Sequence, residues 1–146
     1  MPTDDVTTTA HLTGGCGCGA VQFEVSEPLL GAAYCHCTIC QHRTGTAVQA
    51  SALAAYDSVT VTAGAEHIRS WTPTDGNAKE FCALCGSALL ARSQSDPKVV
   101  YVRLGAINGD PGIRPQAHQF VAYAAPWEPI LDDGLPRFDE RMGAPS

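Results

Sequence analysis

The chain has 146 residues, which is enough for one domain. A domain of this size buries about two-thirds of its unfolded surface, so the seven cysteines are not needed to compensate for a small core. Its net charge of −6, with two lysines and seven arginines scattered singly, argues against nucleic acid and anionic membranes as partners. No apolar run approaches the ~20 residues of a membrane span, and no apolar segment follows the polar N-terminus, so we expect a cytoplasmic protein.

In chain order, alternating apolar and polar residues predict a first strand over 20–25. One or two helical turns are predicted over 38–43, ending near Gly45, which can adopt a left-handed cap. Turn-forming clusters of Gly, Pro, Asp and Asn separate further short β-prone runs, which predict strands over 59–62, 67–72, 87–91, 99–104 and 120–123. The pattern indicates an all-β fold of several short strands with little helix.

We expect a single domain with short extensions. The N-terminal residues 1–11 are expected to be flexible, and residues 12–138 to form the domain. The charged, Pro- and Gly-rich C-terminal segment is expected to wrap the surface and to fray over the tail, residues 139–146.

All seven cysteines fall into three clusters: Cys16 and Cys18 (C-x-C), Cys35, Cys37 and Cys40 (C-x-C-x-x-C), and Cys82 and Cys85 (C-x-x-C). Clustered cysteines in a cytoplasmic chain are more typical of metal binding or redox chemistry than of disulfides. A C-x-C pair can chelate only where the backbone curls, because zinc-bound sulfurs lie ~3.8 Å apart whereas two extended residues span ~6.6 Å. The glycines on both sides of the first pair permit such a curl.

Two cysteine pairs would make a closed four-thiolate site, the usual structural zinc arrangement. The triplet Cys35, Cys37 and Cys40 would then be a three-thiolate site with an open fourth position, as in catalytic zinc sites. Spacing leaves the partition open, because Cys16 and Cys18 could pair with Cys82 and Cys85 or equally with Cys35 and Cys37. A redox or disulfide role for one cluster is a further alternative.

Several other side chains are candidates for this site. His36 could fill the fourth position, but in an extended segment it points away from its two cysteine neighbours, so we expect it to be packed or solvated instead. His42 and His118 are weaker candidates for a ligand or proton shuttle. An anionic thiol substrate would need positive charge near the triplet, for which the candidates are Arg43, nearest in sequence, and then Arg69, Arg92 and Arg103. Trp71 and Trp127 could wall a pocket, although packing is the commoner role for tryptophan.

Five segments carry a resemblance to a known family: LTGGCGCGAVQFEV (12–25), CHCTICQHRTG (35–45), FCALCGSAL (81–89), PQAHQFVAYAAPW (115–127) and DGLPRF (133–138). Together they resemble the glutathione-dependent formaldehyde-activating enzyme family, also called the centromere-protein-V/formaldehyde-activating family. The resemblance implies an Mss4-like all-β fold. It also implies a structural zinc on Cys16, Cys18, Cys82 and Cys85, and a catalytic zinc on Cys35, Cys37 and Cys40.

The activity implied by the resemblance joins glutathione to formaldehyde as S-hydroxymethylglutathione. The reverse reaction, which breaks the carbon–sulfur bond, is the one that places the enzyme among the carbon–sulfur lyases. We therefore expect a lyase whose partners are a small thiol and an aldehyde. The sequence departs from the family pattern at two places that bear on substrate contacts. Lys79 and Glu80 stand where many relatives have a basic residue before Phe-Cys, and INGDP (107–111) stands where relatives often have a Leu-Asp-Asp-Pro turn. A non-catalytic zinc-stabilised binding module and a thiol-redox sensor are the alternative functions, since fold alone does not fix function.

Overall fold

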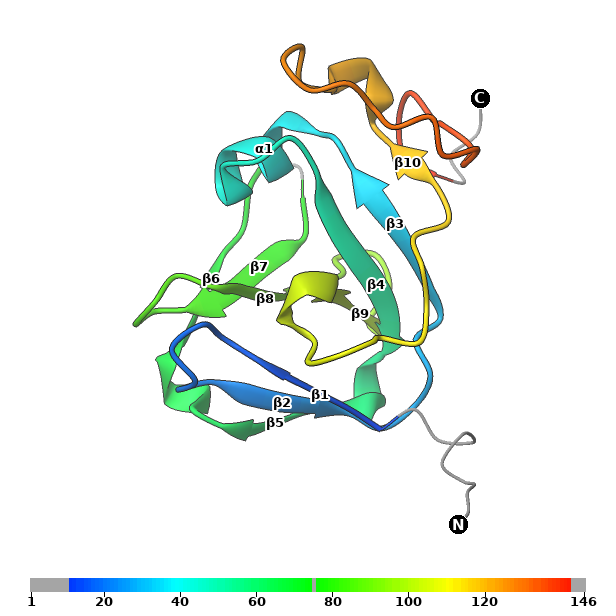
Figure 1. The fold of residues 1–146 in the computed structure, drawn as a ribbon. Coiled ribbons are helices and arrows are strands. Elements are labelled where there is room, and N and C mark those ends of the chain that lie inside the picture. The colour runs from blue at the N-terminus through cyan, green and yellow to red at the C-terminus, as the bar shows by residue number, and fades with distance from the viewer. Residues whose placement is uncertain (1–10, 75, 143–146) are drawn as a thin grey trace.

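The computed structural model describes residues 11–74 and 76–142 and contains two β-sheets (Figure 1). The smaller sheet has the order β1-β2-β5, with antiparallel pairing throughout. Its strands are β1 (Leu12–Gly15), β2 (Gln22–Val25) and β5 (Val59–Ala63). In Figure 1 it lies at the lower end of the molecule, away from the helix α1 (Thr38–Thr44).

The larger sheet has seven strands in the order β10-β3-β4-β9-β8-β7-β6. Their bounds are β3 (Gly31–Cys35), β4 (Gln49–Ala55), β6 (Ile68–Trp71), β7 (Ala78–Cys82), β8 (Ala88–Arg92), β9 (Val99–Arg103) and β10 (His118–Gln119). All neighbours pair antiparallel except β10, which runs parallel to β3. Short 3-10 turns occur at Tyr56–Ser58, Ala65–His67, Leu104–Ala106 and Val121–Tyr123.

The all-β class with little helix is confirmed, and α1 begins and ends where predicted. The strand predicted over 120–123 is wrong: Phe120 has a φ of 59° and starts a 3-10 turn, which leaves only the two-residue β10 before it. Sequence reasoning also missed β1, β3, β4 and β7. The alanine- and glycine-rich strands among them, GAAYC and QASALAA for example, have little intrinsic β-propensity and form because neighbouring strands pair with them.

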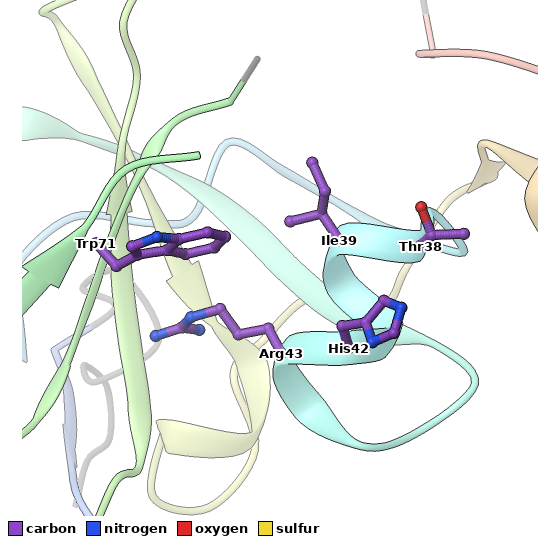
Figure 2. Close-up of a pocket in the computed structure, with 5 residues that line it drawn as sticks. All are labelled: Thr38, Ile39, His42, Arg43 and Trp71. Atoms are coloured by element: carbon purple, nitrogen blue, oxygen red, sulfur yellow. The ribbon is translucent and has the colours of Figure 1, made fainter. Parts of the chain in front are cut away.

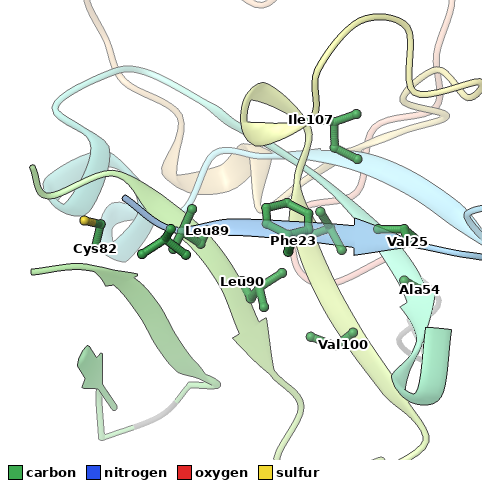
Figure 3. Close-up of a cluster of buried hydrophobic side chains, with 10 residues drawn as sticks. Phe23, Val25, Ala54, Cys82, Leu89, Leu90, Val100 and Ile107 are labelled. Carbon is green, nitrogen blue, oxygen red and sulfur yellow. The ribbon is translucent and has the colours of Figure 1, made fainter. Parts of the chain in front are cut away.

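The two sheets bury a common core (Figure 3). Its fully buried members come from both sheets and include Phe23, Leu89, Leu90, Val100 and Val102. Cys82 belongs to the same cluster, so one of the cysteine clusters is anchored directly in the core.

We expect Phe23→Ala to lower the free energy of unfolding by about 3–5 kcal/mol, because it removes a fully buried ring and leaves a cavity. Urea unfolding of the zinc-loaded protein measures this change. The matched control is Leu30→Ala, whose side chain is 60% exposed and whose loss is expected to cost less than about 0.5 kcal/mol. Equal losses in the two variants would contradict this description of the core.

The chain termini lie largely outside the described residues. The N-terminal segment expected to be flexible falls there except for His11, as do residues 143–146 of the tail. The described part of the C-terminal segment runs along β10: Phe138 N–H donates to the His118 carbonyl (2.8 Å) and Phe120 N–H donates to the Glu140 carbonyl (2.9 Å). Among the described residues, no helix is long and apolar enough to span a membrane.

Candidate metal centres and their surroundings

Four cysteines from two distant parts of the chain converge on one point. Cys16 and Cys18 lie in the turn between β1 and β2, whereas Cys82 ends β7 and Cys85 lies in the turn between β7 and β8. The sulfurs of Cys16 and Cys18 are 3.6 Å apart, those of Cys18 and Cys82 are 4.0 Å apart, and all four lie within 4.8 Å of one another. These separations match the ~3.8 Å of a tetrahedral zinc–thiolate site. We call this group the four-cysteine site.

Local backbone geometry shapes the four-cysteine site. Gly86, with a φ of 80°, closes the second turn and donates its N–H to the Cys82 carbonyl at 2.7 Å. The Gly17 N–H donates to the Ser87 hydroxyl at 2.8 Å, which joins the two turns. The side-chain hydrogen bond with Ser87 lowers the pKa of Cys85 to about 5, so this thiol is prepared to act as a thiolate ligand.

The remaining three cysteines form a second group, which we call the triplet. Cys35 ends β3, Cys37 is the N-cap of α1 and accepts from the Cys40 N–H at 3.3 Å, and Cys40 lies buried in the first turn. The sulfurs of Cys35 and Cys40 are 3.5 Å apart, and all three sulfurs lie within 4.8 Å of one another. In the part of the chain that the structure describes, no further Cys, His, Asp or Glu joins them.

The thiols of the triplet differ in the direction in which their pKa values are shifted. Side-chain hydrogen bonds with Cys35 and Cys40 hold the pKa of Cys37 well below its ordinary value, whereas the hydrogen bond with Cys37 raises the pKa of Cys35. The Gln49 amide also donates to the Cys40 sulfur at 3.3 Å. Three thiols this close can be ionised together only when a cation lies between them.

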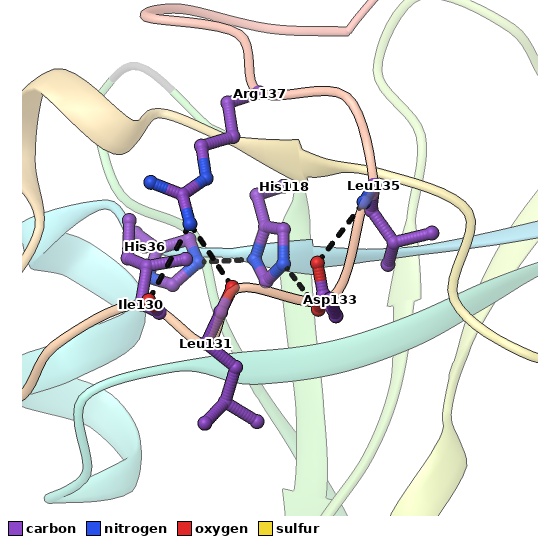
Figure 4. Close-up of polar contacts among 7 residues, drawn as sticks. All are labelled: His36, His118, Ile130, Leu131, Asp133, Leu135 and Arg137. Carbon is purple, nitrogen blue, oxygen red and sulfur yellow. Dashed lines mark hydrogen bonds and ion pairs between the residues drawn. The ribbon is translucent and has the colours of Figure 1, made fainter.

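His36 does not complete the triplet. Its side chain is 5% exposed and its Nε2 lies 2.9 Å from His118 Nδ1, and His118 Nε2 lies 2.9 Å from Asp133 Oδ2 (Figure 4). The ring of Tyr34 stacks on His118 with the centroids 4.9 Å apart. The expectation that His36 points away from the cysteines is therefore confirmed, and His118 lies in this histidine chain rather than at the triplet.

The histidine chain connects the C-terminal segment to the triplet loop. Asp133 also accepts from the Leu135 N–H at 3.1 Å, and the His36 N–H donates to the Gln119 carbonyl at 3.0 Å. In the β10–β3 pairing, Gln119 is the partner of Cys35. The segment after β10 therefore braces the backbone from which two of the three cysteines project.

From this bracing we expect Asp133→Ala to weaken metal binding at the triplet by about tenfold, because hydrogen-bonded neighbours of metal ligands hold them in position. Competition with a chromophoric zinc chelator measures the affinity of each site separately. The four-cysteine site should keep its affinity in this variant. The control is the exposed neighbour Asp132→Ala, and a similar loss in both variants would contradict a role for the histidine chain.

Three basic side chains lie within electrostatic range of the triplet. Arg103 is 7% exposed and donates to the Ser51 hydroxyl at 2.7 Å, but its Nε and Nη2 are buried with no hydrogen-bond partner among the described residues. Burial lowers the pKa of Arg103, Lys79 and Arg43, while the charge of a Cys40 thiolate opposes that shift in each. We call these three residues the cationic cluster.

No acidic side chain in the described ranges, 11–74 and 76–142, forms an ion pair with a member of the cationic cluster. A divalent metal bound by three thiolates carries a net charge of −1, which fits a buried, unpaired guanidinium. The donor set and its surroundings therefore fit a zinc-type metal at the triplet.

The structure also sorts the arginines named from the sequence. Arg43 packs over the Phe81 ring at 5.6 Å and faces the triplet, as Arg103 does. Arg92 instead pairs with Glu80 at 3.0 Å, and Arg69 donates to the backbone carbonyls of Glu66 and Ile68. Lys79 was noted only as a departure from relatives, although alternation along β7 places it on the same face as Phe81.

Two hollows flank α1. A groove of about 630 Å³ is lined by Cys16 and Ser87 at the four-cysteine site and by Thr44, Gln49 and Arg103. A cavity of about 470 Å³ is lined by Thr38, Ile39, His42, Arg43 and Trp71 (Figure 2). His42 is thus exposed on the outer face of α1, and Trp127 lines neither hollow.

Comparison with known proteins gives concordant results. The profile of the family described as glutathione-dependent formaldehyde-activating enzyme matches residues 11–123. A Halomonas elongata protein provisionally named a glutathione-dependent formaldehyde-activating enzyme is 32% identical over 105 residues, covering 68% of this chain and 67% of that protein. A crystal structure of a Rhodobacter sphaeroides protein superposes with a TM-score of 0.57 at 29% identity, covering 67% of this chain and 89% of the other. The chain belongs to the glutathione-dependent formaldehyde-activating enzyme family.

Proposed function

We propose that the protein is a zinc-dependent carbon–sulfur lyase that makes and breaks the bond between a small thiol, such as glutathione, and an aldehyde. S-hydroxymethylglutathione is the adduct that the family name suggests. The observation that carries the proposal is the triplet: three convergent thiols without a fourth protein ligand among the described residues, beside a four-cysteine site that is complete. A closed site serves structure, and an incomplete one can accept a substrate.

In this proposal, Cys16, Cys18, Cys82 and Cys85 hold a structural zinc, and Cys35, Cys37 and Cys40 hold a second, catalytic zinc. The second zinc would supply a soft Lewis acid that stabilises a substrate thiol as its thiolate near neutral pH. In the reaction, the thiol sulfur bonds to the aldehyde carbon, the carbonyl π pair moves to oxygen, and the proton of the thiol ends on that oxygen. The reverse reaction breaks the same bonds.

The residues of the chain supply the remaining parts of the mechanism. The cationic cluster favours an anionic thiol in the vicinity of the triplet, because its three positive charges have no acidic partner among the described residues. The Gln49 amide and the N-cap contact of Cys37 hold the cysteine sulfurs in position. The histidine chain fixes the loop from behind. Positioning of this kind accounts for much of the acceleration of bimolecular reactions in enzymes.

Exchange NMR with ¹³C-formaldehyde and glutathione tests the proposal, because it measures adduct formation and breakdown at equilibrium. The zinc-loaded protein is expected to accelerate exchange above the spontaneous rate, and Cys37→Ser is expected to abolish the acceleration. A protein that binds two zinc ions but leaves the exchange rates of formaldehyde and larger aldehydes unchanged would rule out the lyase function.

A further inference from the structure

The cavity between α1 and β6 has a mainly apolar lining, which the polar, charged glutathione moiety of the proposed reaction does not explain. Its volume of about 470 Å³ lies within the roughly 300–1,000 Å³ that is usual for small-molecule sites. Formaldehyde contributes only one carbon atom to the adduct, too little to cover an apolar lining of this extent. A cavity of this size can instead hold an organic group of several carbon atoms. We call it the Trp71 cavity.

The Trp71 cavity lies against the turn of helix that carries the triplet. Two of its lining residues, Thr38 and Ile39, are the residues between Cys37 and Cys40. A third, Arg43, lies three residues after Cys40, on the neighbouring turn of α1. No triplet cysteine lines the cavity, so an organic group attached to a sulfur at the triplet would reach it by extending past Thr38 and Ile39.

The far wall of the Trp71 cavity is an aromatic side chain without a core to pack against. Trp71 ends β6, the edge strand of the large sheet, and its side chain is 49% exposed. In Figure 2 its indole ring lies across the cavity from Ile39. Large apolar side chains on either side of a hollow favour an apolar occupant, because its burial removes apolar surface from water on both partners.

Charge at the cavity indicates what the apolar occupant is attached to. The Arg43 guanidinium stacks on Phe81 and has no acidic partner within 4.0 Å in the described ranges. It lines the cavity, and the charge of a Cys40 thiolate would raise its pKa, which places the two groups within electrostatic range of each other. An apolar hollow with one unpaired cation at its triplet side is complementary to an apolar group carried by an anionic thiol.

We propose that the Trp71 cavity binds the apolar body of the aldehyde-derived group, and that the preferred electrophile is an aldehyde of several carbon atoms rather than formaldehyde. The proposal rests on the lyase function proposed above. The chemistry is unchanged: the thiol sulfur bonds to the aldehyde carbon, and the thiol proton ends on the former carbonyl oxygen. The cavity changes only which aldehyde is held next to the sulfur.

Binding of stable thioethers tests the cavity independently of catalysis. By calorimetry, zinc-loaded protein is expected to bind S-hexylglutathione at least about tenfold more tightly than S-methylglutathione, because each buried methylene contributes to affinity. Trp71→Ala should remove most of this difference, and Trp127→Phe should preserve it. In Trp127→Phe, Trp71 is the only tryptophan, so its fluorescence should change on binding S-hexylglutathione.

Exchange NMR with hexanal and with formaldehyde completes the test. We expect kcat/KM to be at least about tenfold higher for hexanal, and Trp71→Ala to lower the hexanal value about tenfold while changing the formaldehyde value less than about twofold. Equal affinities for the two thioethers, or a hexyl preference that survives in Trp71→Ala, overturns the cavity assignment. If neither aldehyde reacts faster than spontaneously, the lyase function fails, whereas a Trp71-dependent hexyl preference would still support the cavity as a binding site.

Discussion

Replacing Cys85 with serine is expected to remove the zinc of the four-cysteine site and to abolish the cooperative fold at 25 °C. That site joins the β1–β2 turn of the small sheet to the β7–β8 turn of the large sheet. The binding free energy of structural zinc in zinc-finger peptides is about 10–16 kcal/mol. The free energy of unfolding of a whole domain is only about 5–15 kcal/mol. Loss of this metal can therefore cost the entire stability. Zinc analysis by mass spectrometry and urea unfolding measure both effects.

Cys85 is the informative position because its side chain is exposed, so unfolding cannot be attributed to a cavity in the core. The matched variant is Cys37→Ser, which removes a ligand of the triplet. It should lose one of two zinc ions and still unfold cooperatively. Loss of both zinc ions in Cys37→Ser, or a fully folded Cys85→Ser protein, would contradict the division into a structural and a reactive site.

Replacing Arg103 with methionine is expected to weaken zinc binding at the triplet about 10–100-fold without lowering the stability of the protein when only the four-cysteine site holds zinc and the triplet is empty. Arg103 is 7% exposed, and its Nε and Nη2 have no partner among the described residues. Without metal, the methionine variant loses a buried charge that was poorly compensated, which is neutral or stabilising. With metal, it loses the counter-charge for an anionic three-thiolate site.

Arg103→Met is thus expected to lower zinc affinity but not stability. This combination distinguishes a counter-charge for the metal site from a packing role, whose loss would lower stability. Zinc affinity at the triplet is measured by chelator competition. Stability with the triplet empty is measured by urea unfolding in the Cys37→Ser background, which keeps the zinc of the four-cysteine site. Arg103→Lys keeps the charge and should retain most of the zinc affinity. Arg92→Met is the control, because Arg92 pairs with Glu80 and not with the triplet. A methionine variant that loses stability with the triplet empty but keeps its zinc affinity at the triplet would assign Arg103 to packing alone.

The sequence predicted the cysteine groups and the α1 turn because both depend on local spacing. Cys40 lies in one short helix that Cys37 caps at its start and Gly45 caps at its left-handed end, and all three are close in sequence. Spacing alone left the partner of Cys16 and Cys18 open, since both solutions put thiols at chelating distance. The structure brings them to Cys82 and Cys85 through contacts between the two sheets.

Other features of the site depend on contacts between residues far apart in the chain. The link from His36 to Asp133 requires the parallel β3–β10 pair, and β10 is a two-residue strand with no propensity signal. The role of Lys79 required the β7 strand, which was not predicted. Only the folded arrangement could show that Arg103 is buried and unpaired while Arg92 is paired.

The proposed lyase function requires a metal at the triplet with an open coordination position that a substrate thiol can take. Zinc K-edge X-ray absorption of the fully loaded protein measures this directly. A four-sulfur and a three-sulfur site predict an average of about 3.5 sulfur ligands per zinc, rising to about 4 when glutathione is added. An average of 4 sulfur ligands per zinc before glutathione is added would contradict an open position at the triplet. So would an average that glutathione leaves unchanged.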